Sequence, residues 1–455
     1  MKRAIAGLAI LAALIALGSL LAGELGLIAA GGSQEAGDGK PGDGGDTRKA
    51  DRQSGPGMDQ ERGDALDPDP SLPEDEAAET MRRLARIGAR FGARGGEWVE
   101  IELPEEYQNQ PVPAASGRDF TTDFSRAAIS YEDIIAGGPP KDGIPSIDEP
   151  RFITVGEADQ WLEASEPVIL FRHEGQARIY PLQILTWHEI VNDQFSGLPI
   201  AVTYCPLCNT GMVFDRRFYD EVLELGVSGR LIYSNMIMYD RQTESWWIQA
   251  TGQGIAGKFA GQRLRLLPSG MLSWADAREA YPEAEVLSRD TGHRRNYGRN
   301  PYAGYDSAER PFLYRGPEVV PAGSNPMERV LTVYHGEAVE AVPYSLLERE
   351  GVVELELDGR RVVVFWQSGT ASALDAQRVP EGRDVGSAAA YYAEIAGRSV
   401  SFERYNDRIR DRDTGSTWDI AGRAVDGDLA GAVLEQALSV EHFLFSYRAF
   451  HTGRP

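Results

Sequence analysis

The chain has 455 residues and a formal net charge of −23 at pH 7, with 46 basic and 69 acidic side chains. Such an acidic surface repels phosphate backbones and anionic headgroups, so nucleic acid is excluded as the expected partner. The length exceeds what one hydrophobic core usually supports, so two domains with additional segments are expected.

Residues 1–30 have the pattern of a membrane-targeting segment. Lys2 and Arg3 precede an uncharged apolar run at residues 4–23. A spanning helix needs about 20 apolar residues, so this run favours an uncleaved signal anchor over a cleaved signal peptide. Because basic flanks stay in the cytoplasm, the rest of the chain is expected outside it. It would be held to the cytoplasmic membrane by this segment, or secreted if the segment is cleaved.

The next segments predict a tether and a helix. Residues 31–70 are rich in Gly, Asp, Pro, Ser and Gln, which is typical of a disordered acidic linker. Ser71 and Glu74 then have the spacing of a capping box, with Pro73 in the first turn. Acidic residues are followed by basic ones, an order that suits a helix dipole, so a helix is predicted within residues 71–95.

From about residue 101 the sequence consists of short β-rich runs separated by Gly, Asp and Pro. Alternation and turn residues predict a hairpin and then further strands, and two stretches have helical periodicity. The hairpin is expected at 167–175 and 176–180, the strands at 198–204, 212–214 and 231–239, and the helices at 181–193 and 274–281.

The chain also repeats itself. Residues 171–185 resemble 333–347, residues 201–215 resemble 362–375, and D-R-x-T-x-S occurs at 240–245 and again at 411–416. This order predicts a β-rich α+β fold with two related domains, at 120–310 and 311–455. The second is a degenerate copy, because Phe365 and Ser368 stand where the first copy has cysteines.

The only two cysteines of the chain, Cys205 and Cys208, form a C-P-x-C turn. Proline after the first cysteine fixes φ and removes an N–H, and Asn209 tolerates the left-handed conformation that closes a tight turn. Thiols are both soft metal ligands and redox groups. The functional centre is therefore expected at this turn.

A metal site is the first hypothesis, with Cu or Zn as the ion. Structural zinc takes four ligands and the chain has no second C-x-x-C, so a metal would recruit a histidine. His188 is the best placed of the six histidines, on the predicted helix just before the turn, with Glu189 and Asn192 in supporting positions. Met212 would add a thioether suited to Cu(I), although a core methionine is the commoner role.

Two alternatives stay open. A C-P-x-C pair also suits a thiol–disulfide oxidoreductase, in which Cys205 would be the attacking thiolate. The other alternative is a non-catalytic scaffold with a structural disulfide, although a bridge that closes so short a loop removes little entropy from the unfolded chain. The residues alone do not decide whether the protein is an enzyme, and they point to no cofactor other than Cu or Zn.

Two polar clusters are candidate ligand-binding sites. Asp240 and Arg241 precede two tryptophans, but the recurrence of their string favours a structural turn. Tyr302 lies in a loop at 296–305 that carries three tyrosines and an arginine, a composition typical of ligand-binding loops and of packed linkers alike. The sequence does not specify which small ligand or protein partner would bind there.

Several strings together carry a family resemblance: HEIVND at 188–193, YCPLCNTG at 204–211, MYDRQTESWW at 238–247 and RNPYAGY at 299–305. From about residue 142 to 449 the chain resembles the uncharacterised family called domain of unknown function 3179. The resemblance implies a secreted or membrane-anchored bacterial or archaeal protein. It implies no particular activity.

Overall fold

The structure is a computed structural model that describes residues 101–113, 116, 118–317 and 320–451, all of which belong to one compact unit. The predicted signal segment, the linker and the helix within 71–95 lie outside the described residues. Within those residues, no helix is long and apolar enough to cross a membrane.

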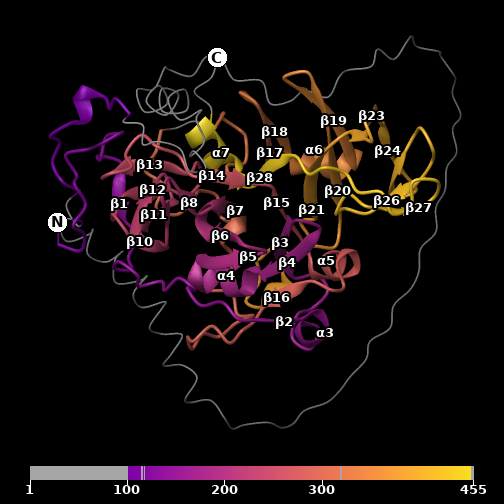
Figure 1. Cartoon of the computed structure of the whole chain (residues 1–455), viewed down its shortest axis with the longest axis horizontal. Helices are drawn as coiled ribbons and strands as arrows, with labels where there is room; N and C mark the ends of the chain where they lie inside the picture. Colours follow the sequence, from indigo (N-terminus) through magenta and orange to yellow (C-terminus); the bar gives the residue numbers. More distant parts are fainter. Residues whose placement is uncertain (1–100, 114–115, 117, 318–319, 452–455) are drawn as a thin grey trace, which may run out of the picture. The chain divides into compact units, whose positions relative to one another are not determined.

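Strands dominate the described chain, as predicted for a β-rich α+β fold (Figure 1). Its first half forms three larger sheets and a short ribbon. Sheet β15-β3-β4-β16-β2 comprises Ser269–Ser273, Pro167–His173, Gln176–Pro181, Glu285–Leu287 and Phe152–Thr154. Sheet β14-β7-β6-β5 comprises Arg265–Leu267, Thr210–Asp215, Leu198–Cys205 and Ile190–Phe195. Sheet β1-β10-β11-β12-β13 comprises Ile134–Ala136, Leu225–Ile232, Asn235–Asp240, Trp246–Ile248 and Gln253–Ala256, and ribbon β8-β9 comprises Arg217–Phe218 and Glu221–Val222.

The second half forms smaller sheets. Sheet β18-β17-β28 comprises Ala338–Pro343, Arg329–His335 and Leu438–Phe443. Sheet β19-β20-β21 comprises Val352–Leu357, Arg360–Gln367 and Ser387–Tyr392. Sheet β24-β25-β26-β27 comprises Phe402–Tyr405, Arg408–Asp411, Thr417–Trp418 and Ala424–Asp426, and ribbon β22-β23 comprises Glu394–Ile395 and Arg398–Ser399.

The helices are short and follow strands. The α-helices are α3 Val155–Ala158, α4 Leu182–His188, α5 Trp274–Ala280, α6 Tyr344–Glu350 and α7 Leu444–His451. The 3₁₀ turns are η1 Glu105–Tyr107, η2 Pro206–Cys208, η3 Tyr305–Ser307 and η4 Val379–Glu381. Helices α4 and α6 each begin directly after a proline at the end of a hairpin, where the missing N–H costs no helical hydrogen bond.

The two halves follow one element order. Strand β3 pairs with β4 and β15, and β17 pairs in the same way with β18 and β28. Each hairpin leads through a short helix into an antiparallel strand pair, β5-β6 or β19-β20. The same order of elements in both halves is what a duplication would produce, and the duplication itself stays a prediction.

Two of the predicted elements need correction. The helix expected at 181–193 ends at His188, because Glu189 takes a left-handed conformation with φ 59°. The residues after it pair with β6 as strand β5 instead. The single strand expected at 231–239 is interrupted, because Tyr233 and Ser234 both have positive φ and turn the chain between β10 and β11. The hairpin at 167–180 and helix α5 are confirmed.

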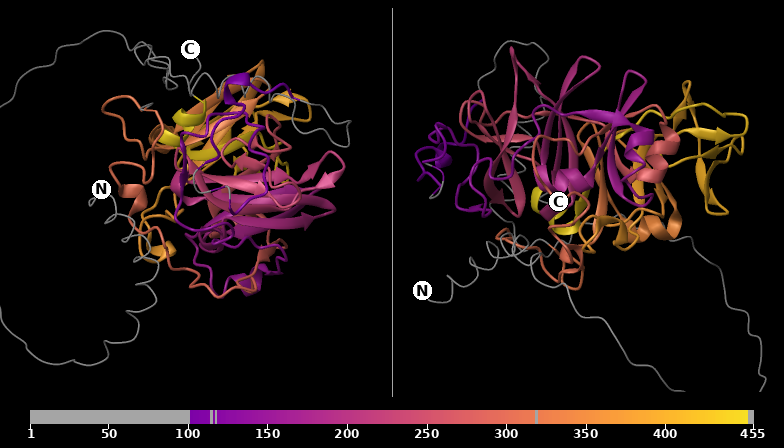
Figure 2. Two further views of the ribbon diagram at one scale, coloured as in Figure 1. Left: turned by 90° about the vertical axis from the view of Figure 1, so that its left-hand side faces the viewer. Right: turned by 90° about the horizontal axis from the view of Figure 1, so that it is seen from below.

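The cores join the two halves of the chain. One core cluster packs Trp274 and Val168 from the first half with Phe365 and Trp418 from the second. A second core cluster places both cysteines together with Phe443 and Leu374. The ribbons of the first half (magenta) and of the second half (orange to yellow) lie against each other in Figure 2. The domain boundary near residue 311 stays a prediction, but burial of the cysteine turn depends on both halves.

Candidate functional site

The C-P-x-C turn lies at the end of the β6-β7 hairpin. Cys205 and Thr210 are the last paired residues of the hairpin, and the 3₁₀ turn η2 lies between them. Residues three apart in a 3₁₀ turn lie on the same side, which brings the two thiols together. Asn209 closes the turn with φ 51°, the left-handed conformation expected from the sequence.

Both thiols are free and shielded from solvent. Cys205 is 2% exposed and Cys208 is fully buried. Burial is the main reason that the pKa of Cys205 lies well above its usual range, and the hydrogen bond with Cys208 raises it further. Cys205 is therefore an uncharged thiol in this structure, not a thiolate ready to attack.

Glu189 supplies a carboxyl group to the same place. Its left-handed conformation at the end of α4 turns the chain into β5, and the residue is 7% exposed. Burial raises the pKa of Glu189 well above its usual range, and the neighbouring Cys205 raises it further. Tyr302 Oη donates a long hydrogen bond of 3.5 Å to Glu189 Oε1. A carboxylic acid that holds its proton near neutral pH thus lies beside the thiols.

The loop at 296–305 lies against the turn. Tyr305 Oη donates to the carbonyl of Leu207 at 2.8 Å, inside the C-P-x-C turn itself. The loop backbone is held in place by hydrogen bonds to the segment at 374–377, including one from Tyr305 N to Leu374 O at 3.0 Å. The sequence drew attention to this loop through its tyrosines, but nothing in the sequence singled out Tyr305.

His188 does not join the thiols. Its Nδ1 lies 2.8 Å from the carbonyl of Pro145 and its Nε2 lies 2.7 Å from Tyr297 Oη, so both ring nitrogens already have partners. Burial lowers the pKa of His188 to about 4, and the nearby His293 contributes to this lowering. The histidine is a neutral, hydrogen-bonded core residue.

The predicted set of Cys205, Cys208 and His188 is therefore not assembled. Among the residues that the structure describes, no group of three or more His, Cys, Asp or Glu side chains is arranged to hold a metal ion. Asn192, which was predicted to support His188, makes its side-chain hydrogen bonds elsewhere. Asn192 lies on β5, where its Nδ2 donates to Asp148 at 2.7 Å and to the carbonyl of Leu225 at 2.8 Å.

Asp240 and Arg241 have the geometry of a structural turn. Asp240 accepts hydrogen bonds from Thr243 N at 2.7 Å and from Trp247 Nε1 at 2.9 Å. The second D-R-x-T-x-S string makes the same bonds, with Asp411 accepting from the equivalent threonine and tryptophan. Arg241 forms an ion pair with Asp148 at 2.5 Å.

The turn also contacts strand β28 of the second half. Asn209 donates a hydrogen bond to Glu441, and Thr210 Oγ1 lies 3.1 Å from His442 Nδ1. Glu441 in turn forms a buried ion pair with Arg329 at 2.6 Å. Sequence reasoning missed this network, because its members are far apart in the chain and form no motif.

A comparison with known protein families identifies the family of this chain. The family model described as "Protein of unknown function (DUF3179)" matches residues 141–453. The chain belongs to this family. No curated protein and no solved structure matches the chain. Within the DUF3179 region lie the dithiol, Glu189 and the tyrosine loop, so the function has to be argued from their geometry.

Proposed function

We propose that this DUF3179 protein is a thiol–disulfide redox protein in which Cys205 and Cys208 interconvert between dithiol and disulfide, with Glu189 as the proton donor. The supporting observation is the buried carboxyl of Glu189, which keeps its proton next to Cys205 in a predominantly apolar core. This is the alternative function considered from the sequence, which had Cys205 as the attacking thiolate; here Cys205 is the leaving sulfur and Glu189 is added as its proton donor.

Burial suits both oxidation states of the pair. A dithiol and a disulfide are both uncharged, whereas burying a thiolate in this core without a cation beside it would cost desolvation free energy. Each change of state still has to move protons, because two thiols lose two protons when they form a disulfide. Outside the cytoplasm, where we expect the body of the chain, both states of such a pair are accessible.

The reduction uses a low-molecular-weight thiol, RSH, as electron donor. The thiolate RS⁻ attacks Sγ of Cys208, the Cys205–Cys208 bond breaks, and Sγ of Cys205 leaves with the electron pair and takes the proton from Glu189. A second RS⁻ then attacks the sulfur of R in the mixed disulfide. Cys208 leaves as a thiolate and takes a proton from water, and Glu189 recovers its proton from solvent. The net products are the protein dithiol and RSSR, with two electrons transferred.

The accessibility of the two sulfur atoms limits which thiols can react with them. Neither sulfur is open to solvent, and Tyr305 holds the turn through Leu207. The turn must open before exchange can occur, so the reaction is expected to be slow and to favour small thiols over folded protein partners.

The first test is a redox titration of the purified protein. We would equilibrate it in buffers of reduced and oxidised glutathione, alkylate the free thiols and measure the mass of the intact chain. A single transition in which both thiols disappear together supports the proposal. Thiols that stay free at every ratio, or that form only separate glutathione adducts, would overturn it.

The second test is Glu189→Gln, which keeps the shape of a protonated carboxyl and removes its acidic proton. We expect reduction of the disulfide by dithiothreitol to slow by about 10²-fold, the usual effect of losing a general acid. Glu174→Gln, at an exposed carboxyl in the β3-β4 turn, is the matched control. A Glu189→Gln protein that is reduced at the wild-type rate would show that Glu189 is not the proton donor.

A soft-metal site remains the second candidate, because four methionines share the core cluster with both cysteines: Met212, Met236, Met238 and Met327. Thiolates and thioethers together suit Cu(I) better than Zn²⁺. Competition for Cu(I) against a coloured chelator tests it. Retention of one Cu(I) that is lost in Cys208→Ser but kept in His188→Gln would favour this candidate, and failure of the wild-type protein to retain Cu(I) would remove it.

A further inference from the structure

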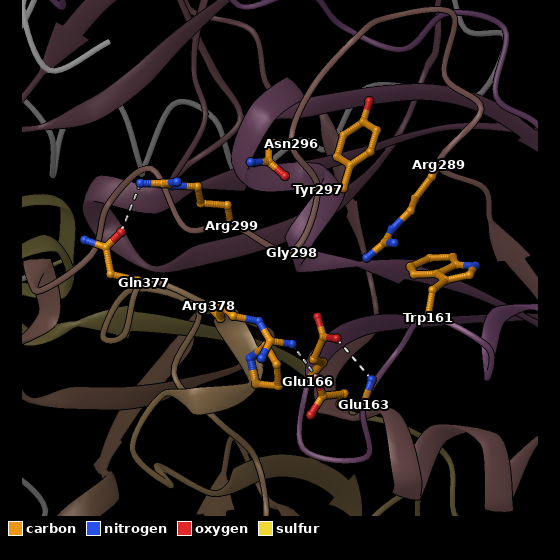
Figure 3. A pocket seen from close by; sticks show the side chains of 11 residues that line it. Trp161, Glu163, Glu166, Arg289, Asn296, Tyr297, Gly298, Arg299, Gln377 and Arg378 are labelled. Atoms are coloured by element: carbon orange, nitrogen blue, oxygen red, sulfur yellow. Dashed lines mark hydrogen bonds and ion pairs between the residues drawn. The ribbon is translucent and has the colours of Figure 1, made fainter. Parts of the chain in front are cut away.

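A cavity of about 360 Å³ lies away from the buried thiols, between the first half of the chain and the loop that carries Gln377 and Arg378 (Figure 3). Its walls include Trp161, Glu166, Arg289 and Arg299. This volume is at the lower end of the range for small-molecule sites, so it suits a compact ligand and not a polymer.

Two of the three arginines in the cavity wall have no carboxylate partner. Arg378 forms ion pairs with Glu163 and Glu381, each at 2.8 Å. Neither Arg289 nor Arg299 forms an ion pair with any carboxylate that the structure describes. Two guanidinium groups thus line one cavity of an acidic protein without an ion-pair contact, although Glu166 is close enough to attract Arg289.

The arginines are held in position by neutral groups. The guanidinium of Arg289 lies over the ring of Trp161, 4.3 Å from its centroid, and its Nε donates to Gln183 Oε1 at 3.0 Å. Arg299 Nη2 makes a long hydrogen bond of 3.4 Å to Gln377 Oε1, as Figure 3 shows. These contacts orient the planar donors and leave N–H groups free for a planar acceptor.

Of the two carboxyl groups that line the cavity, Glu163 pairs with Arg378, and Glu166 does little to neutralise Arg289 and Arg299. Glu166 is 2% exposed and accepts hydrogen bonds from Glu163 N at 3.0 Å and from Gln183 Nε2 at 2.6 Å. Burial raises the pKa of Glu166 to about 7, so at neutral pH a large fraction of it carries no charge. The cavity is therefore positive overall.

We propose that this cavity binds a small organic anion through its oxyanion groups, carboxylates or phosphates, which Arg289 and Arg299 contact from opposite sides of the cavity. The amide groups of Asn296 and Gln377, which also line the cavity, supply further hydrogen bonds to the ligand. Unpaired arginines in a concave, partly enclosed site are the usual means of binding such groups in proteins. The proposal does not depend on the redox chemistry of the thiols.

Isothermal titration calorimetry of the whole protein tests the proposal, with inorganic phosphate and succinate as separate probes. We expect saturable binding of at least one probe, and the probe that binds identifies the oxyanion. Arg299→Gln should weaken that binding at least tenfold, and Arg289→Gln should do the same. Arg294→Gln removes the same charge from an exposed position in the neighbouring loop, so it should change binding less than twofold.

Three results would overturn the proposal. The first is no saturable binding of either probe at millimolar concentration. The second is wild-type binding in Arg299→Gln, which makes few contacts and is expected to fold even if Arg289→Gln does not. The third is equal weakening by Arg294→Gln, which would indicate general attraction of anions to this face instead of a site.

Discussion

His188 and Glu189 are adjacent at the end of helix α4 and have different neighbours, but both side chains are uncharged. His188 is fully buried against Pro145 and Tyr297, whereas Glu189 points toward Tyr302 and Cys205. Burial lowers the pKa of the histidine and raises that of the glutamate. Both side chains are therefore neutral at pH 7, since each charged form would lose its hydration in the core.

The titration of His188 predicts how stability depends on pH. Its pKa is about 4 in the folded protein and 6.5 when the ring is fully hydrated, as in the unfolded chain, so between these values the unfolded chain binds more protons. Its contribution to the free energy of unfolding is then lost as the pH falls from 6.5 to 4, by about 3 kcal/mol in total. His188→Gln does not titrate. The free energy of unfolding of the wild type, relative to that of His188→Gln, should therefore be higher at pH 7 than at pH 4 by about 3 kcal/mol.

Urea unfolding of both proteins at several pH values provides the measurement. His442, which is also buried with a lowered pKa, titrates in both proteins and cancels from the difference. A difference between the two free energies that does not vary with pH would contradict the assignment of His188 as a buried neutral ring.

At the scale of elements, the loop at 296–305 acts as a cover for the C-P-x-C turn. The hydrogen bond from Tyr305 Oη to Leu207 O is a direct link between the two. Backbone hydrogen bonds hold the loop to the segment at 374–377. We therefore expect these contacts to limit how often the thiols become exposed, in addition to the core packing around them.

Tyr305→Phe tests this role. Loss of one hydrogen bond of about 1 kcal/mol should increase the open population, and with it the rate of reaction of the thiols with a thiol-specific reagent, about fivefold. The double variant Cys205→Ser/Cys208→Ser should give no reaction, which shows that the signal comes from the turn. An unchanged rate in Tyr305→Phe would mean that exposure of the thiols follows another motion.

The short elements also show what pattern reasoning captures. Turn residues and alternation predicted the β3-β4 hairpin, the end of β6 and the left-handed Asn209, because each depends on neighbours in the chain. The C-terminal half of the predicted helix at 181–193 failed. Its periodicity was helical, but pairing with β6 and the turn at Glu189 outweighed it. Strand pairing is a tertiary contact that local periodicity does not contain.

At the scale of the whole molecule, a buried ionic network joins the thiol turn to the second half. Arg329 is 7% exposed, and it pairs with Glu441 at 2.6 Å and donates to Ser372 Oγ at 2.9 Å. Glu441 also accepts a hydrogen bond from Tyr344 at 2.6 Å and another from Asn209. Removing one member leaves an uncompensated buried charge, which usually costs about 3–5 kcal/mol.

Arg329→Met should therefore lower the free energy of unfolding by roughly 3 kcal/mol. Because the two halves share core clusters, wild type and variant should each unfold in one transition. Urea unfolding followed by far-ultraviolet circular dichroism and by tryptophan fluorescence measures both effects. Two separate transitions would contradict the shared cores and would instead support independent domains at 120–310 and 311–455.

The β-rich class, the repeated order of strings, the geometry of the C-P-x-C turn and the family resemblance can all be inferred from the residues alone. These features depend on residue types at short spacing, which act through local conformation. The neighbours of the thiols follow instead from folding: it placed Glu189 and the tyrosine loop there, turned His188 toward Pro145 and formed an arginine-lined cavity between the halves. Burial and contacts across long sequence separations set these arrangements, and they leave no periodic trace in the chain.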